Sequence, residues 1–127
     1  MELTAIVIGL ALIEYIVFTM LCGRERARRG IVAPATSGDP TFERYFRVQQ
    51  NSVEQLVIFV PAMLLFGRYV SAPIGAGLGL VFILGRALFA RGYYQDPPKR
   101  ASGFGLSLLS NLVLLLGGLI GAVIAYL

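Results

Sequence analysis

Apolar residues occur along this chain in four long runs, which short polar segments separate. A run of about 20 apolar residues is long enough for a helix to cross the hydrocarbon core of a bilayer. The second run begins with a polar stretch that continues into it without a break, so both parts are expected to form one helix. We therefore predict one membrane domain over residues 1–127, with four transmembrane helices at about residues 3–23, 40–69, 73–95 and 103–126.

Local signals place several helix ends. Asp39 followed by Pro40 is typical of an N-cap and a proline in the first turn, so the second helix should begin there. The Asp-Pro-Pro sequence at residues 96–98 should end the third helix. The first run is too long for the core of a signal peptide and follows Glu2 rather than basic residues, so we expect it to be retained.

Composition assigns the chain to the membrane proteins. Hydrophobic residues make up 57% of the 127 residues and charged residues only 14%, which is more apolar than a soluble domain with a polar surface. The predicted fold class is therefore all-α, an integral membrane bundle with four helices per subunit. We expect so small a bundle to complete its core by oligomerising.

The basic residues are concentrated near the helix ends. The chain has eleven Lys and Arg residues and a net charge of +4, and every basic residue except Arg68 lies in or beside the first and third connections. Such residues mark the cytoplasmic side of a membrane protein. We expect the first and third loops to be cytoplasmic and both termini to lie on the opposite side. This topology explains the positive charge better than nucleic-acid binding does.

The residue types that serve many catalytic sites are scarce. The chain has no His, the commonest metal ligand and the usual general base, and Cys22 is its only cysteine. We therefore expect no metal site and no internal disulfide. Because no His is present to activate it, Cys22 is expected to be a buried, unreactive thiol.

Polar side chains line one face at the start of the second predicted helix. At about 100° per residue, a single stripe contains the side chains of Glu43, Arg47, Gln50 and Glu54, with Asn51 at its edge. Such groups are costly at membrane depth unless they face protein, water or a ligand. The stripe therefore indicates a functional site at the mouth of this helix.

The third predicted helix has a polar and aromatic face of its own. Arg86, Phe89 and Tyr93 follow one another at i, i+3 and i+7, which places them on one side of the helix. Arg86 cannot face lipid cheaply, so it must look into the bundle. We expect it to pair with a carboxylate, either Glu54 or Glu14.

Polar residues within the other two spans have structural as well as functional interpretations. Glu14, in the first span, either binds a proton or cation or pairs with an arginine of a neighbouring helix, and we favour the ion pair. In the fourth span, Ser110 and Asn111 are expected to form hydrogen bonds to other helices rather than to a ligand.

The predicted cytoplasmic end combines arginines, carboxylates, amides and tyrosines with adjoining lipid. Guanidinium groups suit an anionic, polar small molecule, and the carboxylates can hold its ammonium group if it has one. The bilayer can supply an apolar second substrate. Since no His or metal cluster is present, the reactive group is expected to belong to the ligand, for example a thiolate whose pKa a neighbouring arginine lowers.

Two segments have the residue types and spacing of a known family. The first segment comprises Phe42, Glu43, Arg44, Arg47, Gln49, Asn51 and Glu54. The second comprises Arg86, Tyr93 and Arg100. These segments resemble the second-helix and third-helix patterns of the MAPEG family, the membrane-associated proteins in eicosanoid and glutathione metabolism. Residues 92–100, with the sequence GYYQDPPKR, resemble most the microsomal glutathione transferase 3 type and its bacterial relatives.

The resemblance implies a homotrimer of four-helix subunits that binds glutathione between neighbouring subunits, near the cytoplasmic face. The residues that it implies for glutathione binding are Arg47, Gln49, Asn51, Glu54, Tyr93 and Arg28. Gln49 would contribute from the adjacent subunit, and Arg28, in the first loop, would meet a glutathione carboxylate. Arg100 matches the catalytic arginine that stabilises the glutathione thiolate.

The implied function is that of a membrane-bound glutathione transferase, with glutathione as the co-substrate. The second substrate would be a lipophilic electrophile from the bilayer, or a lipid hydroperoxide if the protein is also a glutathione-dependent peroxidase. The chain departs from the leukotriene-forming branch of the family at Gln55 and Phe89, where that branch has tyrosines. These departures bear on the pose of glutathione and on any leukotriene specificity.

Three alternatives remain open on the sequence. The first is a non-catalytic member of the same family that binds a lipid and presents it to a partner. The second is a small proton-coupled multidrug transporter that uses Glu14. The third is a purely structural bundle, in which ion pairs of Arg47 with Glu43 and of Arg86 with Glu54 serve assembly.

Overall fold

A computed structural model describes all residues from 1 to 127 and contains helices but no strand. Its elements, in chain order, are α1 (Glu2–Arg29), α2 (Pro40–Tyr69), α3 (Ala72–Gln95), the short 3-10 helix η1 (Pro97–Arg100) and α4 (Ala101–Tyr126). The four long helices are each long and apolar enough to cross a membrane, with η1 leading directly into α4. The all-α fold with four helices of membrane length is therefore confirmed.

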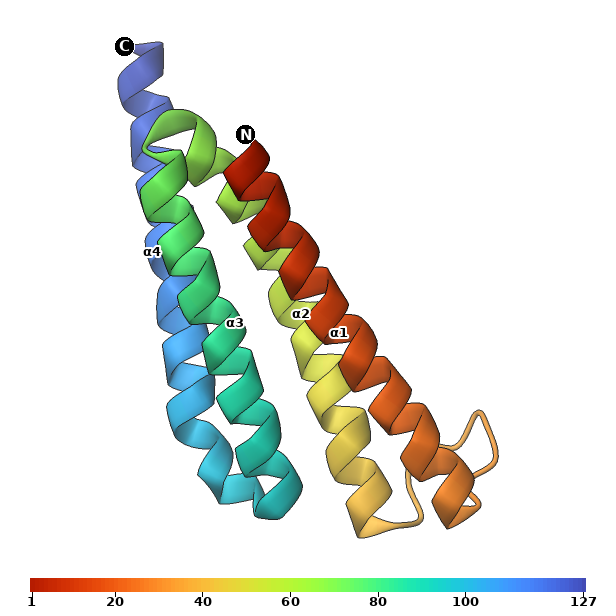
Figure 1. Ribbon diagram of the computed structural model, residues 1–127. Helices are drawn as coiled ribbons and strands as arrows, with labels where there is room; N and C mark the ends of the chain where they lie inside the picture. The colour runs from red at the N-terminus through yellow and green to blue at the C-terminus, as the bar shows by residue number, and fades with distance from the viewer.

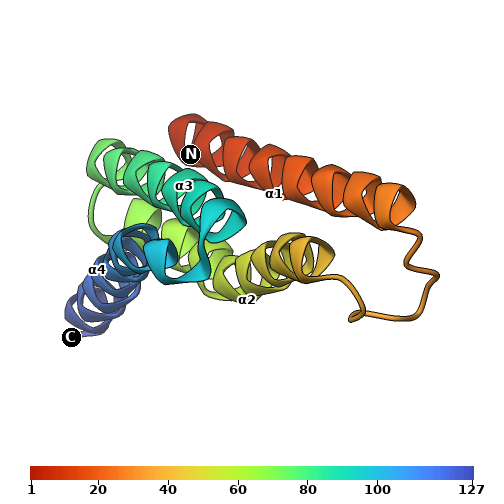
Figure 2. The ribbon, with the colours of Figure 1, turned by 90° about the horizontal axis from the view of Figure 1, so that it is seen from below.

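The four long helices run in alternating directions (Figure 1). Both termini consequently lie at one end of the molecule, and the α1–α2 loop lies at the other end together with η1. Helix α4 packs against α2 and α3, whereas α1 packs against α2 and α3 on the side away from α4 (Figure 2). The mouth of α2 therefore lies at the same end as the last turn of α3 and the beginning of α4.

The structure corrects the predicted end of the first helix. The sequence predicts an end near residue 23, whereas α1 continues to Arg29. The buried carboxylate of Glu25 holds this extension, because its oxygens lie 3.6 Å from Arg28 and 3.4 Å from Arg29, one helical turn further on. Gly30 then ends the helix in the left-handed conformation, at φ 67°, which glycine adopts without strain.

Side-chain caps are present at the starts of α2, where Asp39 is the predicted cap, and of α3, where no cap was predicted. A side-chain oxygen of Asp39 accepts a hydrogen bond of 2.9 Å from the backbone N–H of Phe42. The hydroxyl of Ser71 accepts one of 3.2 Å from the backbone N–H of Ile74. Each cap satisfies a donor that the first turn of a helix leaves unpaired, so both helices begin at defined positions.

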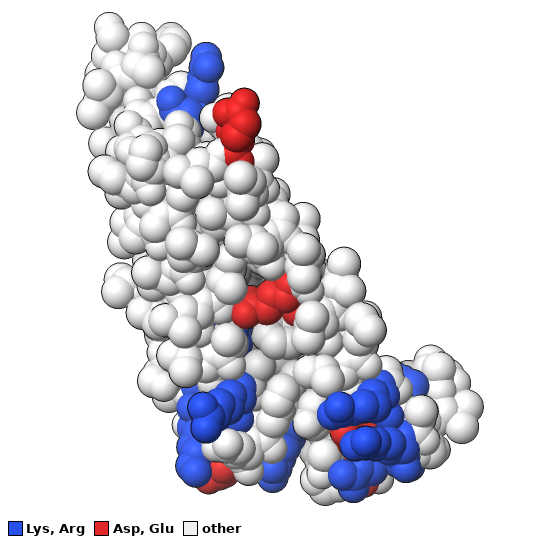
Figure 3. Space-filling view, in the orientation of Figure 1, with Lys and Arg blue, Asp and Glu red and all other residues white.

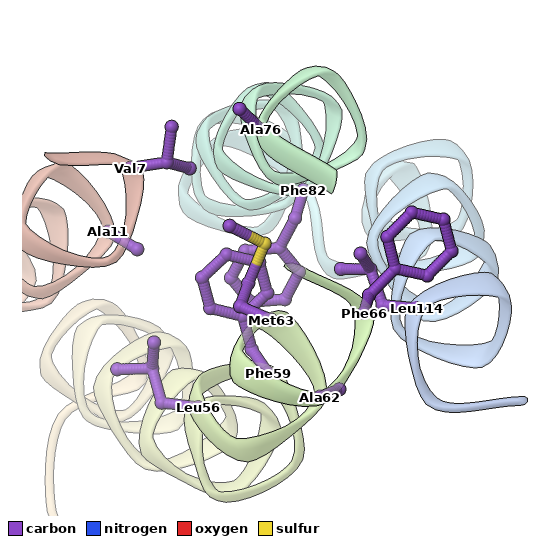
Figure 4. Close-up of a cluster of buried hydrophobic side chains, with 10 residues drawn as sticks. All are labelled: Val7, Ala11, Leu56, Phe59, Ala62, Met63, Phe66, Ala76, Phe82 and Leu114. Carbon is purple, nitrogen blue, oxygen red and sulfur yellow. The ribbon is translucent and has the colours of Figure 1, made fainter. Parts of the chain in front are cut away.

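The main hydrophobic core, drawn in Figure 4, consists of ten buried residues, and their positions along the helices place it in the half of the bundle nearer the termini. The rings of Phe59 and Phe82 stack at its centre, with their centroids 4.0 Å apart, and Met63 packs beside them. The half of the bundle that contains η1 has a smaller cluster of four buried residues, Phe18, Val48, Phe89 and Ala90. That half has more room for polar groups and a ligand.

Two glycines bring the backbones of α3 and α4 into direct contact. A Cβ atom at Gly85 would lie 2.8 Å from the backbone nitrogen of Ser107, and one at Gly103 would overlap the backbone of Phe89. Such close approach requires residues without a side chain. The contact fixes the start of α4 against the second half of α3.

We expect Gly103→Ala to destabilise the fold. The added methyl group would overlap the backbone of α3, and overpacking of this kind typically costs about 1–3 kcal/mol. Gly105→Ala is a matched control two residues away, because a Cβ atom there meets nothing within 4 Å. Thermal unfolding in detergent should show a lower midpoint for the first variant alone. Equal midpoints for the two variants would contradict the close contact between α3 and α4.

Candidate functional site

Basic side chains gather at the end of the molecule opposite the termini (Figure 3). We call this end, which contains the α1–α2 loop and η1, the basic end. Three arginines there each form an ion pair with the carboxylate of Glu25, namely Arg24, Arg28 and Arg29. The charge distribution agrees with the predicted concentration of arginines around the first and third connections.

A cavity of about 740 Å³ opens at the basic end between α2, α3 and the start of α4. The residues that line it are Arg47, Asn51, Phe89, Tyr93, Pro98, Arg100, Ala101 and Phe104. Its volume lies in the range of small-molecule sites, about 300–1,000 Å³. Four of the residues predicted to bind or activate glutathione, from three different elements, therefore share one cavity.

One wall of the cavity is formed by η1 and α3. The guanidinium of Arg100 lies 5.7 Å from the centre of the Tyr93 ring, within the range of a cation–π interaction. The same guanidinium donates a hydrogen bond of 2.9 Å to the carbonyl of Pro97. Because Gly92 has no side chain, the backbone of Lys99 can lie directly against α3. The short 3-10 helix thus carries Arg100 back over the end of α3.

Aromatic rings form the apolar side of the cavity. The ring centroids of Phe89 and Tyr93 lie 5.5 Å apart, and those of Phe89 and Phe104 lie 6.2 Å apart. Phe89 is almost completely buried, whereas Tyr93 and Phe104 are half-buried. The lining of the cavity therefore combines guanidinium and amide groups with aromatic rings.

The structure shows hydrogen bonds in place of the predicted ion pair of Arg86, although Glu14, one of the two predicted partners, is close enough to act on it electrostatically. The side chain of Arg86 is only 1% exposed, and no carboxylate lies within 4.0 Å of it. Instead, its Nη2 donates to Asn51 Oδ1 at 2.8 Å and to Ser52 Oγ at 2.9 Å, and its Nη1 donates to Ser107 Oγ at 3.3 Å. Asn51 and Ser52 can reach the guanidinium because they lie on the inner face of α2, whereas Glu54 lies on the exposed face.

The ion pairs of the structural alternative are therefore absent. Arg86 does not pair with Glu54, and Arg47 forms no ion pair with Glu43. Instead, Glu43 accepts a hydrogen bond of 3.3 Å from the backbone N–H of Gly38, which helps to close the first loop onto α2. Arg47 makes neither a hydrogen bond nor an ion pair, so its guanidinium is free to bind a ligand.

Three predicted glutathione-binding residues do not line the cavity. Glu54 is exposed on the outside of α2, and Gln49 is half-buried. Arg28 lies on α1 and contacts Glu25, with 3.6 Å between Nη1 and Oε1. Within one subunit, the structure therefore brings together Arg47, Asn51, Tyr93 and Arg100, but not Gln49, Glu54 or Arg28.

The polar residues of α4 behave differently from one another. As predicted, Asn111 bonds across helices, because its Nδ2 donates to the side chain of Gln55 at 3.1 Å and to its carbonyl at 3.3 Å. The prediction is wrong for Ser110, whose hydroxyl donates to the carbonyl of Leu106 in its own helix. A serine in a helix can satisfy its hydroxyl in this way without a partner on another helix. The side-chain oxygen of Gln55 is thus hydrogen-bonded to α4.

Sequence reasoning missed the function of Arg44. Its Nη1 donates to the carbonyls of Tyr94 and Gln95, at 3.3 Å and 3.1 Å. These carbonyls are in the last turn of α3, where intrahelical donors are lacking and the helix dipole favours a cation. The ring of Tyr45 also stacks on that of Tyr94, with 3.9 Å between centroids. Although Arg44 is part of the motif at residues 42–44, nothing in the sequence indicates that it faces α3.

The fold and the cavity define a small multi-pass membrane protein with a ligand-sized, positively charged cavity at its basic end. A sequence model of the MAPEG family matches residues 4–120. This match covers nearly the whole chain, and the protein therefore belongs to the MAPEG family. Family membership and the four apolar helices agree that it is an integral membrane protein.

Several relatives share much of this sequence. An uncharacterized protein of Synechocystis sp. is 46% identical over 116 residues, which are 91% of this chain and 85% of that protein. Human microsomal glutathione S-transferase 2 is 42% identical over 103 residues, or 80% of this chain and 70% of the relative. Leukotriene C4 synthase of Cavia porcellus is 30% identical over 97 residues, which are 76% of this chain and 63% of that protein. The finer resemblance to the type 3 transferases stays a prediction.

We expect Arg44→Ala to loosen the last turn of α3 and with it one wall of the cavity. The variant leaves two carbonyls without their charged donor, and such hydrogen bonds contribute about 1.5–3 kcal/mol. Hydrogen–deuterium exchange should therefore be roughly tenfold or more faster near residues 92–96. Arg68→Ala is the control, because Arg68 is exposed in the same helix and contacts only the ring of Tyr69. Unchanged exchange in Arg44→Ala would show that the contact does not hold α3.

Proposed function

We propose that this protein is a membrane-bound glutathione transferase. Its cavity at the basic end would bind glutathione and stabilise the thiolate for attack on lipophilic electrophiles. The observation that carries the proposal is the meeting of Arg47, Asn51, Tyr93 and Arg100 in one cavity of about 740 Å³. Family membership supports it, as do the relatives whose names describe glutathione S-transferases.

The cavity has groups that suit the acceptor groups of glutathione. Glutathione has two carboxylates, a thiol and an ammonium group, so it is an anion at neutral pH. Arg47 has no partner within the subunit, and its planar guanidinium can bind a carboxylate through two parallel hydrogen bonds. Asn51 can donate to a second acceptor from the adjacent turn of α2. Both residues therefore serve to bind and orient the tripeptide.

Arg100 is the residue that we assign to the thiolate. A positive charge close to a thiol favours its ionised form and so lowers its pKa. The thiol proton would pass to water, and the sulfur would form a bond to an electrophilic carbon as the leaving group departs with its electron pair. Because Tyr93 and Pro97 already hold the guanidinium, Arg100 needs little reorganisation to stabilise the sulfur anion.

The aromatic side of the cavity is suited to the second substrate. Phe89 and Phe104 contribute apolar rings to the lining, on helices that are apolar enough to cross the bilayer. An apolar electrophile could therefore reach the sulfur without crossing water. A lipid hydroperoxide would react differently: the sulfur would bond to the terminal peroxide oxygen, and the O–O bond would break to release the lipid alcohol. A second glutathione would then convert the sulfenic acid to glutathione disulfide and water.

The proposal extends to a homotrimer whose basic end is cytoplasmic and whose termini lie on the opposite side. Many apolar side chains on the outer faces of the helices are exposed, as lipid contact or subunit contact requires. Glu54 and Gln49 lie outside the cavity of their own subunit, so they would reach glutathione only where a neighbouring subunit meets α2. Arg28 would contact it from the last turn of α1. The arginines at the basic end support the cytoplasmic assignment.

The remaining alternatives have less support. A proton-coupled transporter would use Glu14, which is half-buried and makes neither a hydrogen bond nor an ion pair. Membership of the MAPEG family favours glutathione chemistry over transport. A non-catalytic lipid-binding member of the family would have the same fold, and it differs from the transferase in not forming the thiolate.

We expect Arg100→Ala to reduce catalysis far more than binding. Loss of one preorganised group that stabilises a developing anion typically costs about 10²–10³ in kcat. The rate of conjugation of glutathione to a chlorodinitrobenzene should fall in that range, while the Kd of glutathione rises less than about tenfold. Lys99→Ala is the control, because Lys99 is an exposed neighbouring cation that does not line the cavity. An active Arg100→Ala variant would remove Arg100 from the mechanism.

We expect Glu54→Gln to weaken glutathione binding by about tenfold, because a charged hydrogen bond to the glutathione ammonium would be lost. Isothermal titration in detergent measures the Kd, and light scattering checks that the oligomer is unchanged. Gln50→Ala is the control, because Gln50 is exposed on the same helix, and we expect this variant to leave the Kd of glutathione unchanged. If Glu54→Gln binds glutathione as the native protein does, the ligand does not reach the outer face of α2.

A further inference from the structure

The most constrained polar group next to the cavity is the guanidinium of Arg86. It is 1% exposed and donates to oxygen atoms of two other helices, Asn51 and Ser52 on α2 and Ser107 on α4. The ring of Phe89 lies 4.2 Å from its central carbon. Arg86 is therefore held from several sides, and its position leaves little freedom to the residues that it contacts.

One of these contacts determines how Asn51 is oriented. An asparagine side chain has one oxygen, which accepts hydrogen bonds, and one NH2 group, which donates them. Arginine has donors only, so the atom of Asn51 that lies 2.8 Å from Arg86 Nη2 must be the oxygen. The NH2 group of Asn51 makes no hydrogen bond within the subunit and is the part of the amide left for the cavity that Asn51 lines.

We propose that Arg86 is a positioning residue that holds the Asn51 amide with its NH2 group available to the cavity. The cavity then offers only donors along α2, the guanidinium of Arg47 and the amide NH2 of Asn51. The ligand group bound there must be an acceptor, a carboxylate or a peptide carbonyl, and an ammonium group is rejected. This inference rests on the proposed function, since it states which part of glutathione faces α2.

The surroundings of Arg86 support a role beyond packing. A buried cation is costly unless it is well hydrogen-bonded, and replacing a buried charge by apolar groups is often neutral or stabilising. Arg86 has no carboxylate within 4.0 Å, its Nε has no acceptor, and the carboxylate of Glu14 acts on it only from a greater distance, so it is not arranged for the greatest stability. Two of the residues that it contacts, Asn51 and Phe89, line the cavity. The free-energy cost of burying Arg86 is therefore better explained by the residues that it positions at the cavity than by a gain in stability.

The decisive variant is Asn51→Asp, which has nearly the same shape. An aspartate still accepts from Arg86, so the contact between α2 and α3 is kept or strengthened. The NH2 group toward the cavity is, however, replaced by an oxygen that cannot donate. We expect the Kd of glutathione to rise at least tenfold while the thermal unfolding midpoint is unchanged or higher. If Asn51 had only a structural role, a variant with an unchanged unfolding midpoint would also keep its Kd for glutathione.

A second set of variants tests Arg86 itself. Arg86→Gln should also raise the Kd of glutathione about tenfold, because the Asn51 amide is then free to turn. Arg86→Lys, which keeps a charged donor, should recover part of the affinity. Arg91→Gln is the control, since Arg91 is an exposed arginine of the same helix that does not line the cavity. If Arg86→Gln fails to fold, Asn51→Asp decides the question, because it retains Arg86.

The outcomes separate this inference from the proposed function. Isothermal titration of the native protein with glutathione and S-hexyl glutathione comes first, and failure to bind either would overturn both. If the native protein binds glutathione and Asn51→Asp binds it equally well or better, the orientation of the amide is wrong while the proposed function stands. Weaker binding by Asn51→Asp at an unchanged unfolding midpoint is the result that we expect.

Discussion

The buried guanidinium of Arg86 is the interaction on which the arrangement of this end of the bundle depends. Its hydrogen bonds join α3 to α2 through Asn51 and Ser52, and α3 to α4 through Ser107. A hydrogen bond to a charged group typically contributes about 1.5–3 kcal/mol, so these contacts are not readily exchanged for others. The three helices that they join are those that supply the walls of the cavity. Local structure, packing and the candidate site therefore meet at one side chain.

The bilayer accounts for the location of the remaining charges. Charged side chains are expensive within lipid, so most of them lie near the helix ends, and the arginines gather at the end that contains the first loop and η1. Close contact of α3 with α4 at Gly85 and Gly103 then brings the start of α4 and η1 over the end of α3. As a result, Arg100 lies beside Tyr93 and shares a cavity with Arg47. A requirement of membrane topology has produced a positively charged site beside an apolar phase.

Much of the fold could be predicted because membrane helices leave strong signals. The apolar runs indicate the spans, and the aspartate-proline pair at residues 39–40 indicates the start of α2. The end of α1 was predicted too early because the arginines after residue 23 resemble a loop. The signal that would have corrected it is local, since Glu25 stands three and four residues before Arg28 and Arg29.

The candidate site was predictable only in part. Helical spacing and the family resemblance indicate Arg47, Asn51, Tyr93 and Arg100, and the structure places these four residues together. The partners of Arg86 could not be predicted, because they depend on how α2 and α4 are rotated about their axes. A carboxylate was the expected hydrogen-bond partner. The acceptors that bond to the guanidinium are instead neutral, namely the hydroxyls of Ser52 and Ser107 and the amide oxygen of Asn51. Small hydroxyl side chains form no pattern that sequence reasoning can detect.

Ionisation of glutathione bound to the native protein would show directly whether the cavity stabilises the thiolate. Ultraviolet difference spectra detect the thiolate, and a pH titration gives the pKa of the bound thiol, with S-hexyl glutathione as a control that has no free thiol. We expect a midpoint well below that of free glutathione, because a guanidinium in the cavity favours the anion. Bound glutathione that titrates at the same pH as free glutathione would contradict this role of the cavity.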